Sequence, residues 1–428
     1  MRRNGLRVHM IWLAGLTLLG CGEPAPEPEA ATAEDEAAAS RGSWRQWGGP
    51  TGDFRLPTTG LAASWPEEGP RVIWSRPLGE GYSAVSADGG TLFTMYRDGD
   101  DDVIIALRAF DGATRWERRY HAPTRPQNTV EFGKGPNATP LVVDNRVVTL
   151  GYSGQLNGLD RETGSMIWSV DLIEDLDGEV LTFGHSASPI AHDGKVLVLV
   201  GGERHGLVAF EASDGSVAWS GPPTSVSYAT PIVIDIDGET QVVYFSADEI
   251  IGLDTSGRKR WSFPVVNRYL NNSTGPIWGD DNLLWVATQL DGGTRALRLT
   301  RGDEATQVEE VWVSQNLSIH FWNALCVGEH VYASVGSNAS IVAGVDVRTG
   351  DILWRERGFE QVNFVHAGEK TILLDANGNL ALVHLGPEGL EVVSRARILD
   401  GPTWTAPTLV GTTLYIRDKK TIRALDLS

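Results

Sequence analysis

Short runs of alternating apolar and polar residues, joined by turns rich in Gly and Asp, fill the chain from about residue 70 onward. The run 159–168 has the sequence Leu-Asp-Arg-Glu-Thr-Gly-Ser-Met-Ile-Trp, which predicts the end of one strand, a turn and the start of another. The carboxylate of Asp160 can accept backbone N–H groups inside such a turn, and Gly164 suits a turn position with positive φ. Trp168 is large enough to fill the gap between two packed layers.

Copies of this hairpin recur along the chain, and a tryptophan follows nearly every turn. The tryptophans that we predict to dock one repeat onto the next are Trp74, Trp116, Trp168, Trp219, Trp261, Trp312 and Trp354. Successive members of this series lie 42 to 52 residues apart. A period of roughly 40–50 residues, built from strand-like segments, is the sequence signature of a propeller blade.

The predicted fold is therefore all-β, an eight-bladed β-propeller. The expected blades cover residues 83–118, 138–170, 187–221, 229–263, 274–313, 323–356, 363–396, and finally 404–427 together with 70–76. Pairing of the N-terminal strand 70–76 with the C-terminal blade would remove the open sheet edge of the ring. The seventh blade has Val392-Val393-Ser394 where its tryptophan should stand, so seven blades is the alternative.

Residues 1–20 have the features of a lipoprotein signal peptide. Three arginines precede an apolar stretch that is too short to span a membrane and that ends in Leu-Leu-Gly before Cys21. This sequence resembles a bacterial lipobox, which implies that Cys21 is lipidated and becomes the mature N-terminus. The alternative is an ordinary secretory signal with a chance cysteine. Gly22, where Asp would signal retention at the inner membrane, favours the outer membrane.

The segment that follows the cysteine has the composition of a tether. Residues 21–43 are acidic and rich in Pro, Ala and Glu, and such a composition cannot bury enough apolar surface to fold. We expect a disordered linker there, and a propeller domain over 44–428.

Charge and cysteine content limit the function further. The chain has 36 basic and 55 acidic side chains, a formal net charge of −19, whereas nucleic-acid binding needs a basic face. Besides Cys21 the sequence contains only Cys326, in an apolar run, so neither a disulfide framework nor a zinc ligand set is available. We predict no metal site, no nucleic-acid partner and a monomeric propeller.

The repeats resemble those of the quinoprotein-type propeller superfamily. The docking motif of that superfamily is Ala-x-Asp-x-x-Thr-Gly-x-x-x-Trp, and residues 159–168 and 345–354 match it best. More narrowly, residues 44–50, 79–83, 135–140 and 400–407 resemble the bacterial pyrroloquinoline-quinone-binding-like repeat proteins. The chain is also similar to the eight-bladed propeller lipoprotein of the outer-membrane barrel-assembly machine, a non-enzymatic scaffold. These likenesses cover roughly 70–428 and indicate a fold more than a function, because propellers host many activities.

The resemblance to quinone-dependent dehydrogenases implies specific requirements for that chemistry. Those enzymes use an adjacent Cys-Cys pair, a tryptophan floor, a calcium or lanthanide held by Glu, Asn and Asp, and an Asp base. This chain lacks the cysteine pair. We therefore expect no cofactor and assign no catalytic residue, and we keep pyrroloquinoline quinone with calcium as the alternative.

The residues that open the innermost strand of each blade should face the mouth of the central channel. They are Tyr82, Asn137, His185, Tyr228, Asn272, Trp322, Asn323, Asn363 and Trp404, with His320 beside them. A ring of amides and aromatics suits a small molecule or a peptide. The alternative is that these groups bond to one another and to ordered water.

Together these features predict an envelope lipoprotein that is a binding or scaffold module in periplasmic or outer-membrane protein assembly. Its partners would be envelope proteins, and its location the periplasmic side of the outer membrane. The alternatives are a quinone-dependent oxidoreductase, or a small-ligand or sugar binder that uses the channel mouth. The complete repeat and the lack of a recognisable catalytic set favour the scaffold.

Overall fold

The computed structural model describes residues 42–58, 60–288, 292–319, 321–336 and 340–428. The predicted signal peptide, Cys21 and the linker up to residue 41 lie outside the described residues, as does His320. No helix in the described part of the chain has the length and apolar character that a membrane span requires.

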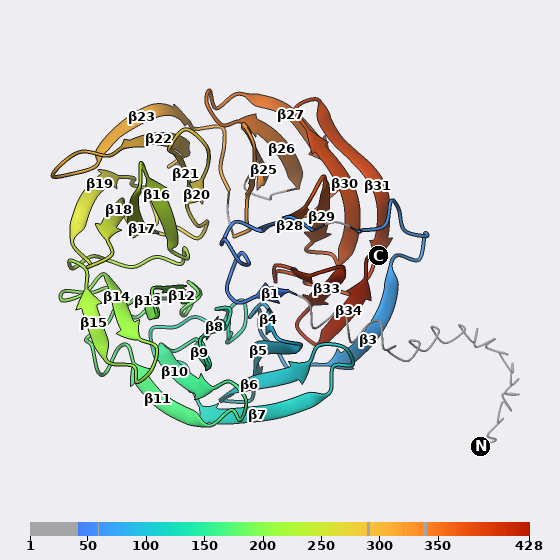
Figure 1. The fold of residues 1–428 in the computed structure, drawn as a ribbon, viewed down its shortest axis with the longest axis horizontal. Coiled ribbons are helices and arrows are strands. Elements are labelled where there is room, and N and C mark those ends of the chain that lie inside the picture. The colour runs from blue at the N-terminus through green and yellow to red at the C-terminus, as the bar shows by residue number, and fades with distance from the viewer. Residues whose placement is uncertain (1–41, 59, 289–291, 320, 337–339) are drawn as a thin grey trace, which may run out of the picture.

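Eight antiparallel sheets stand around a central axis and form a closed ring (Figure 1). Blade 1 consists of β4 (Ser86–Asp88), β5 (Thr91–Asp98), β6 (Asp101–Arg108) and β7 (Thr114–His121), and blade 2 of β8 (Leu141–Val143), β9 (Arg146–Leu150), β10 (Gln155–Asp160) and β11 (Met166–Asp171). Blade 3 consists of β12 (Ile190–His192), β13 (Lys195–Leu199), β14 (Leu207–Glu211) and β15 (Val217–Ser220). Blade 4 consists of β16 (Ile232–Ile236), β17 (Glu239–Phe245), β18 (Glu249–Asp254) and β19 (Lys259–Pro264).

Blades 5 to 8 follow the same plan. Blade 5 consists of β20 (Ile277–Trp278), β21 (Leu283–Ala287), β22 (Thr294–Thr300) and β23 (Gln307–Ser314), and blade 6 of β24 (Leu325–Val327), β25 (His330–Val335), β26 (Ile341–Asp346) and β27 (Ile352–Arg357). Blade 7 consists of β28 (Val362–Ala367), β29 (Lys370–Asp375), β30 (Asn379–Gly386) and β31 (Gly389–Arg397). Blade 8 consists of β32 (Thr408–Val410), β33 (Thr413–Arg417) and β34 (Thr421–Asp426) with β3 (Arg71–Pro77). The prediction of an eight-bladed, all-β propeller is confirmed over the seven-bladed alternative.

The ring is closed by strands from opposite ends of the chain. β3 pairs antiparallel with β34, so the N-terminal strand completes the C-terminal blade. Arg71 lies opposite Asp426 in this register, and the two side chains form an ion pair at 3.1 Å. Two further short strands add to other blades: β1 (Ser43–Trp44) lies beside β4, and β2 (Arg55–Leu56) runs parallel to β28.

Each docking tryptophan fills a space that glycine or alanine leaves open. Trp168 on β11 lies opposite Gly158 on β10, where a Cβ would come within 2.1 Å of the indole. The same indole covers Gly215 in the turn of the next blade and donates its N–H to the carbonyl of Ala212 at 3.1 Å. Gly112, Gly164, Gly257 and Gly350 meet the indoles of Trp74, Trp116, Trp219 and Trp312 in the same way.

The turn itself is held as its sequence suggests. The carboxylate of Asp160 accepts the backbone N–H groups of Glu162 and Thr163, at 3.1 and 2.9 Å, and the hydroxyl of Thr163. These bonds, the hydroxyl of Thr163 foremost, lower the pKa of Asp160. Gly164 adopts φ +67°, and its missing side chain makes room for the preceding blade's tryptophan.

Blade 7, which lacks the docking tryptophan, is contacted at that position by Trp65 of the N-terminal segment. Ser394 lies opposite Leu382, the position that tryptophan and a small residue share in the other blades. The Ser394 hydroxyl accepts the backbone N–H of Trp65 at 2.8 Å and donates to its carbonyl at 3.3 Å. The buried indole of Trp65 packs in the core cluster that contains Ala396 and Ile398. The weakest repeat in the sequence is thus completed by residues more than three hundred positions away.

We expect Trp168→Ala to lower the free energy of unfolding by about 3–5 kcal/mol, because it empties a large aromatic site between two blades. Chemical denaturation of the variant and the wild type would measure this loss. Ile167→Ala is the matched control, since the adjacent Ile167 is 46% exposed. A loss below about 1 kcal/mol for Trp168→Ala would contradict its docking role.

Candidate functional site

The central channel contains a cavity of about 600 Å³. Its wall includes one residue from each of five segments that lead into the innermost strands, and a proline follows each of these residues three positions further along. The residues at this position that line the cavity are Asn137, Ser186, Tyr228, Ser273 and Trp404, followed by Pro140, Pro189, Pro231, Pro276 and Pro407. Tyr82 of blade 1 lines the cavity from the same level.

One end of the cavity is lined by a segment that crosses the channel. The stretch between β1 and β2 runs across the centre of the ring toward β28 (Figure 1). The carbonyl of Arg45 accepts the N–H of Val142 in blade 2 at 2.7 Å, and that of Phe54 accepts the N–H of His366 in blade 7 at 2.9 Å. Trp47 and Phe54 pack edge to face, with ring centroids 5.1 Å apart, and both line the cavity. We call residues 45–54 the plug.

The opposite end is surrounded by aromatic side chains in contact with one another. Tyr82 stacks on Trp404 with centroids 5.1 Å apart. Phe132 contacts both Trp404 and Phe183, at 5.8 and 5.9 Å, and Phe183 meets Tyr228 at 6.0 Å. The series forms an aromatic collar around the mouth.

Sequence reasoning missed three members of the lining at this mouth, Phe132, Phe183 and Phe321. They lie in the inter-blade segments 122–140, 172–189 and 315–324, and not on the strands. For Phe132 and Phe183 the signal that could have found them is loop length, since connections as long as 122–140 and 172–189 in a compact domain are usually functional or disordered. An aromatic residue in such a loop is a candidate for a binding surface.

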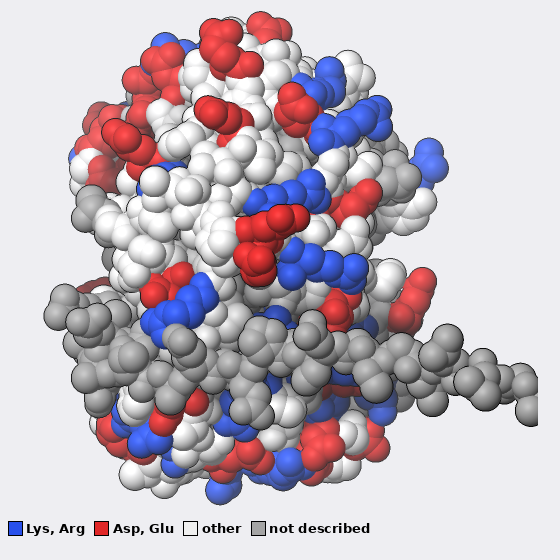
Figure 2. Space-filling model, turned by 90° about the vertical axis from the view of Figure 1, so that its right-hand side faces the viewer, with Lys and Arg blue, Asp and Glu red and all other residues white. Residues whose placement is uncertain are grey.

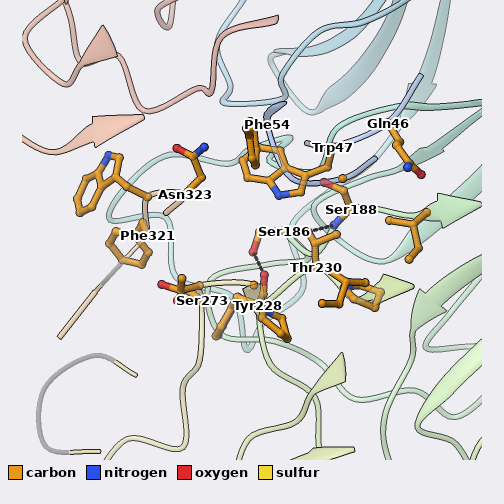
Figure 3. A pocket seen from close by; sticks show the side chains of 18 of the residues that line it. Gln46, Trp47, Phe54, Ser186, Ser188, Tyr228, Thr230, Ser273, Phe321 and Asn323 are labelled. Carbon is orange, nitrogen blue, oxygen red and sulfur yellow. Dashed lines mark hydrogen bonds between the residues drawn. The ribbon is translucent and has the colours of Figure 1, made fainter. Parts of the chain in front are cut away.

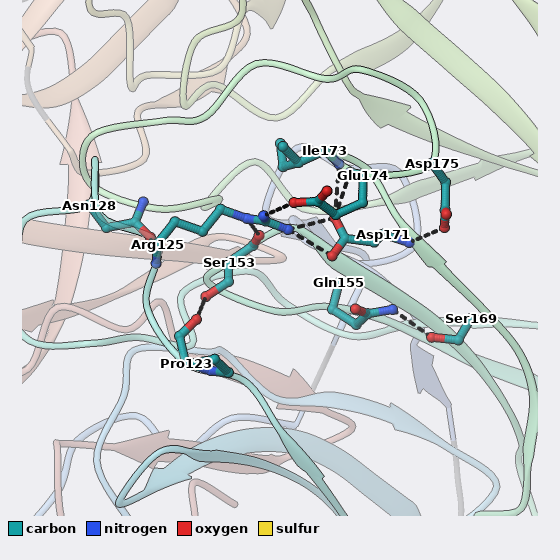
Figure 4. Close-up of polar contacts among 10 residues, drawn as sticks. All are labelled: Pro123, Arg125, Asn128, Ser153, Gln155, Ser169, Asp171, Ile173, Glu174 and Asp175. Atoms are coloured by element: carbon teal, nitrogen blue, oxygen red, sulfur yellow. Dashed lines mark hydrogen bonds and ion pairs between the residues drawn. The ribbon is translucent and has the colours of Figure 1, made fainter.

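An ion-pair cluster holds two of these loops together (Figure 4). Arg125 donates to both carboxylate oxygens of Asp171, at 2.6 and 2.7 Å, to Glu174 at 2.8 Å and to the carbonyl of Ser153 at 2.8 Å. The backbone N–H of Thr129 also donates to the carbonyl of Thr182 at 2.7 Å. Bidentate, charge-assisted bonds of this kind fix geometry as well as adding energy. The two inter-blade segments that carry Phe132 and Phe183 are therefore bonded to each other.

The structure places the predicted mouth residues in two groups. Those that line the cavity are Tyr82, Asn137, Tyr228, Trp322, Asn323 and Trp404. The amide of Asn323 is already occupied, because it donates to the carbonyl of Phe364 at 2.9 Å and accepts that residue's N–H at 2.8 Å.

The other group comprises His185, Asn272 and Asn363, which are not among the residues that line the cavity. Asn272 is buried and donates to the carbonyls of Ser246 and Ala247, at 2.8 and 3.1 Å. Asn363 is buried beside Asn323 and donates to the carbonyl of Trp404 at 3.4 Å.

For two of these residues the lining position is one residue further along the chain. Ser186 and Ser273 line the cavity, whereas their neighbours His185 and Asn272 do not, and all four lie in the segments that precede β12 and β20. Pro189 and Pro276 carried this register in the sequence, because they align Ser186 and Ser273 with Asn137.

The chemistry of the lining does not fit a quinone held with a divalent cation. Among the described residues that line the cavity, only Asp53 and Arg55 are charged, and both belong to the plug end. Within the described ranges no group of three or more His, Cys, Asp or Glu side chains could hold a metal ion. Burial raises the pKa of the Cys326 thiol to about 11, so it stays protonated at neutral pH. One carboxylate cannot provide both the cation ligands and the base that quinone chemistry requires.

Comparison with known proteins identifies the family. A family model described as "Outer membrane protein assembly factor BamB" matches residues 59–307 and, in a second overlapping match, 125–355. The chain belongs to this BamB family. A BamB protein of Salmonella typhimurium (strain LT2) is 26% identical over 295 residues, which cover 66% of this chain and 72% of the relative.

Solved structures share the fold at low identity. BamB from Moraxella catarrhalis superposes with a TM-score of 0.59 and 19% identity, over 83% of this chain and 99% of its own. A europium-containing methanol dehydrogenase gives a TM-score of 0.67 and 11% identity, over 92% and 100%. These likenesses concern the fold alone, and they confirm the predicted resemblance to quinoprotein-type propellers.

His185, although outside the cavity, should make stability depend on pH. Burial, and secondly the nearby Arg125, lowers its pKa to about 4, against about 6.5 in an unfolded chain. The stability that depends on a neutral His185 is therefore fully present above about pH 6.5 and is lost as the pH falls toward 4. By pH 5 the free energy of unfolding has fallen by about 2 kcal/mol.

Urea unfolding of wild type and His185→Gln at pH 7 and pH 5 would measure this contribution. We expect the wild type to lose about 2 kcal/mol more than the variant over that interval. His384→Gln, which removes an exposed imidazole, is the control. Equal losses in wild type and His185→Gln would contradict the neutral, buried state of His185.

Proposed function

We propose that this protein is an outer-membrane protein assembly factor that acts as a binding scaffold in the bacterial envelope. The proposal is supported by its membership of the BamB family and by one surface of the structure. Among the described residues that line the cavity, the charged ones are Asp53 and Arg55, both at the plug end.

The observation that carries the proposal is an exposed apolar rim around the mouth. Six large apolar side chains on the inter-blade loops are 39–63% exposed, and we call them the mouth rim: Val130, Phe132, Val266, Tyr269, Leu270 and Phe321. Large apolar side chains gathered on one face mark interaction sites, and aromatic residues are enriched at protein interfaces.

The outer wall of the ring has a different character. In the side view of Figure 2, acidic and basic side chains are interspersed over the same surface. The exposed apolar residues of the outer strands, such as Ile167, Val217 and Leu353, each belong to a different blade. Apolar residues scattered singly need no functional explanation, so the mouth rim is the surface that a partner would contact.

A groove among the mouth loops adds shape to this surface. It is lined by Glu131, Leu181, Tyr269, Leu270 and Ile319, among others, and shares Phe132, Phe183, Tyr228, Asn271 and Phe321 with the cavity below. A recess with apolar walls can hold the anchor side chains that dominate binding energy. We propose that envelope proteins engaged in outer-membrane assembly dock here.

The proposal includes anchoring through Cys21. The lipobox-like text and the Pro- and Glu-rich stretch behind it support a lipid anchor that holds the propeller on the periplasmic side of the outer membrane.

A photoreactive amino acid placed at Tyr269 should cross-link in cells to an identifiable component of outer-membrane protein assembly. The same group at Leu353, exposed on the outer strand of blade 6, should give no such product. Mass spectrometry of the cross-linked band would identify the partner. Equal labelling at both positions, or no product at Tyr269, would contradict docking at the mouth rim.

Cys21→Ser should remove the protein from the outer-membrane fraction, because the site of lipid attachment is lost. Sucrose-gradient fractionation with immunodetection would show the wild type in the outer membrane and the variant in the inner-membrane or soluble fractions. Persistent sedimentation of Cys21→Ser with the outer membrane would contradict the anchor.

A further inference from the structure

The proposed scaffold uses the mouth rim and leaves the cavity beneath it without a role. Figure 3 shows Ser186, Ser188, Tyr228, Thr230 and Ser273 around this cavity, with Trp47 and Phe54 of the plug and Phe321 also in its lining. The lining combines aromatic rings with hydroxyls and side-chain amides.

The polar groups of the lining differ in the length of the hydrogen bonds that they already make within the protein. Ser188 accepts the N–H of Thr139, and Thr230 accepts that of Ser188, both at 3.0 Å, so these hydroxyls join blades 2, 3 and 4. Two residues earlier in these segments the bonds are longer. They join Asn137 to Phe183 O at 3.4 Å, Ser186 to Tyr228 O at 3.5 Å and Ser273 to Asn271 at 3.5 Å.

Bonds of 3.4–3.5 Å lie beyond the usual hydrogen-bond range and are weak. The amide of Asn137 and the hydroxyls of Ser186 and Ser273 can therefore exchange them for shorter bonds to a ligand. Amides and hydroxyls both donate and accept, so their preferred ligand is one whose groups do the same.

Aromatic faces lie beside these polar groups. Tyr82 stacks on Trp404, and Phe321 lies nearly parallel to Trp404 with centroids 6.5 Å apart. The π faces of such rings are electron-rich and pack against the weakly positive C–H face of a saturated ring. A pyranose has that face on its flat side and hydroxyls around its edge.

The charge of the cavity narrows the ligand class. Asp53 and Arg55, at the plug end, are the charged members of the lining in the described part of the chain. At the mouth itself, Lys419 lies over the Tyr82 ring and donates to the carbonyl of Phe132. A charged ligand held among Asn137, Ser186 and Ser273 would lose its hydration with no charged lining residue beside it, which is costly. The volume of about 600 Å³ lies inside the range of small-molecule sites.

From these observations we propose that the central cavity binds a short neutral saccharide. A sugar ring packs against the group of aromatic rings that Trp404 forms with Tyr82 and Phe321, and its hydroxyls bond to Asn137, Ser186 and Ser273. This proposal does not depend on the scaffold function, because it uses residues below the mouth rim.

Calorimetric titration of the full chain would test the proposal, with the protein in a detergent that has no sugar headgroup. The probes are maltose, cellobiose, lactose and diacetylchitobiose, each raised to about 10 mM, with cellobiouronic acid as a charged counterpart of cellobiose. We expect at least one neutral probe to bind one to one with Kd near or below about 1 mM. We also expect the charged analogue to bind at least about tenfold more weakly than cellobiose.

Variants locate the site. Asn137→Ala and Trp404→Ala should each weaken the binding by about tenfold or more, and Trp404→Phe, which keeps a ring, should restore part of it. Ser186→Ala is a milder change in case Trp404→Ala fails to melt cooperatively. Ile167→Ala, on the outer wall, should bind like wild type.

Three results would overturn the proposal. They are no heat from any neutral probe, binding that these cavity variants leave unchanged, or binding of the tripeptide Phe-Gly-Phe without binding of any saccharide. Tyr269→Asp on the mouth rim separates the two proposals. It should abolish partner cross-linking from a photoreactive group at Leu270 while saccharide binding persists.

Discussion

The contact on which the rest of this structure depends is an indole lying over a glycine. In blade after blade a tryptophan on the outermost strand fills the space left by a missing Cβ, both on its partner strand and on the turn of the next blade. The contact joins neighbours that share no strand hydrogen bonds, so it turns eight small sheets into one ring. A side chain at Gly158 or Gly215 would occupy the space of the Trp168 indole.

A ring held in this way can vary its loops without losing its fold. The blades keep their register, while the connections around one mouth grow long and carry aromatic side chains. Arg125 ties two of these connections together through Asp171 and Glu174. The same face thus presents an apolar rim for a macromolecular partner and, beneath it, a cavity of aromatic, amide and hydroxyl groups. The two levels share the phenylalanines of the collar, so a partner docked on the rim would cover whatever occupies the cavity.

The departures from the repeat are as informative as the repeat. Blade 7 lacks its tryptophan, and the hydroxyl of Ser394 instead holds the backbone of Trp65. The plug crosses from blade 1 to blade 7 and contacts blade 2 on the way. The N-terminal segment therefore takes part in closing both the ring and the channel, which explains why tryptophans appear before the first complete blade.

The all-β class, the eight blades and the pairing of the first strand with the last blade could be predicted from the sequence, because each rests on a local pattern repeated at a constant period. The family resemblance followed from the same repeats. About half of the candidate site could be predicted as well, namely the residues at the correct opening position, such as Tyr82, Asn137 and Trp404. The positions of Ser186 and Ser273 were also recorded in the sequence, by Pro189 and Pro276, although the prediction took their neighbours His185 and Asn272. Only the tertiary structure decided that the plug lines one end of the channel, that Trp65 packs against blade 7, and that Phe132, Phe183 and Phe321 meet at the mouth. These are contacts between segments far apart in the chain, and no local period records them.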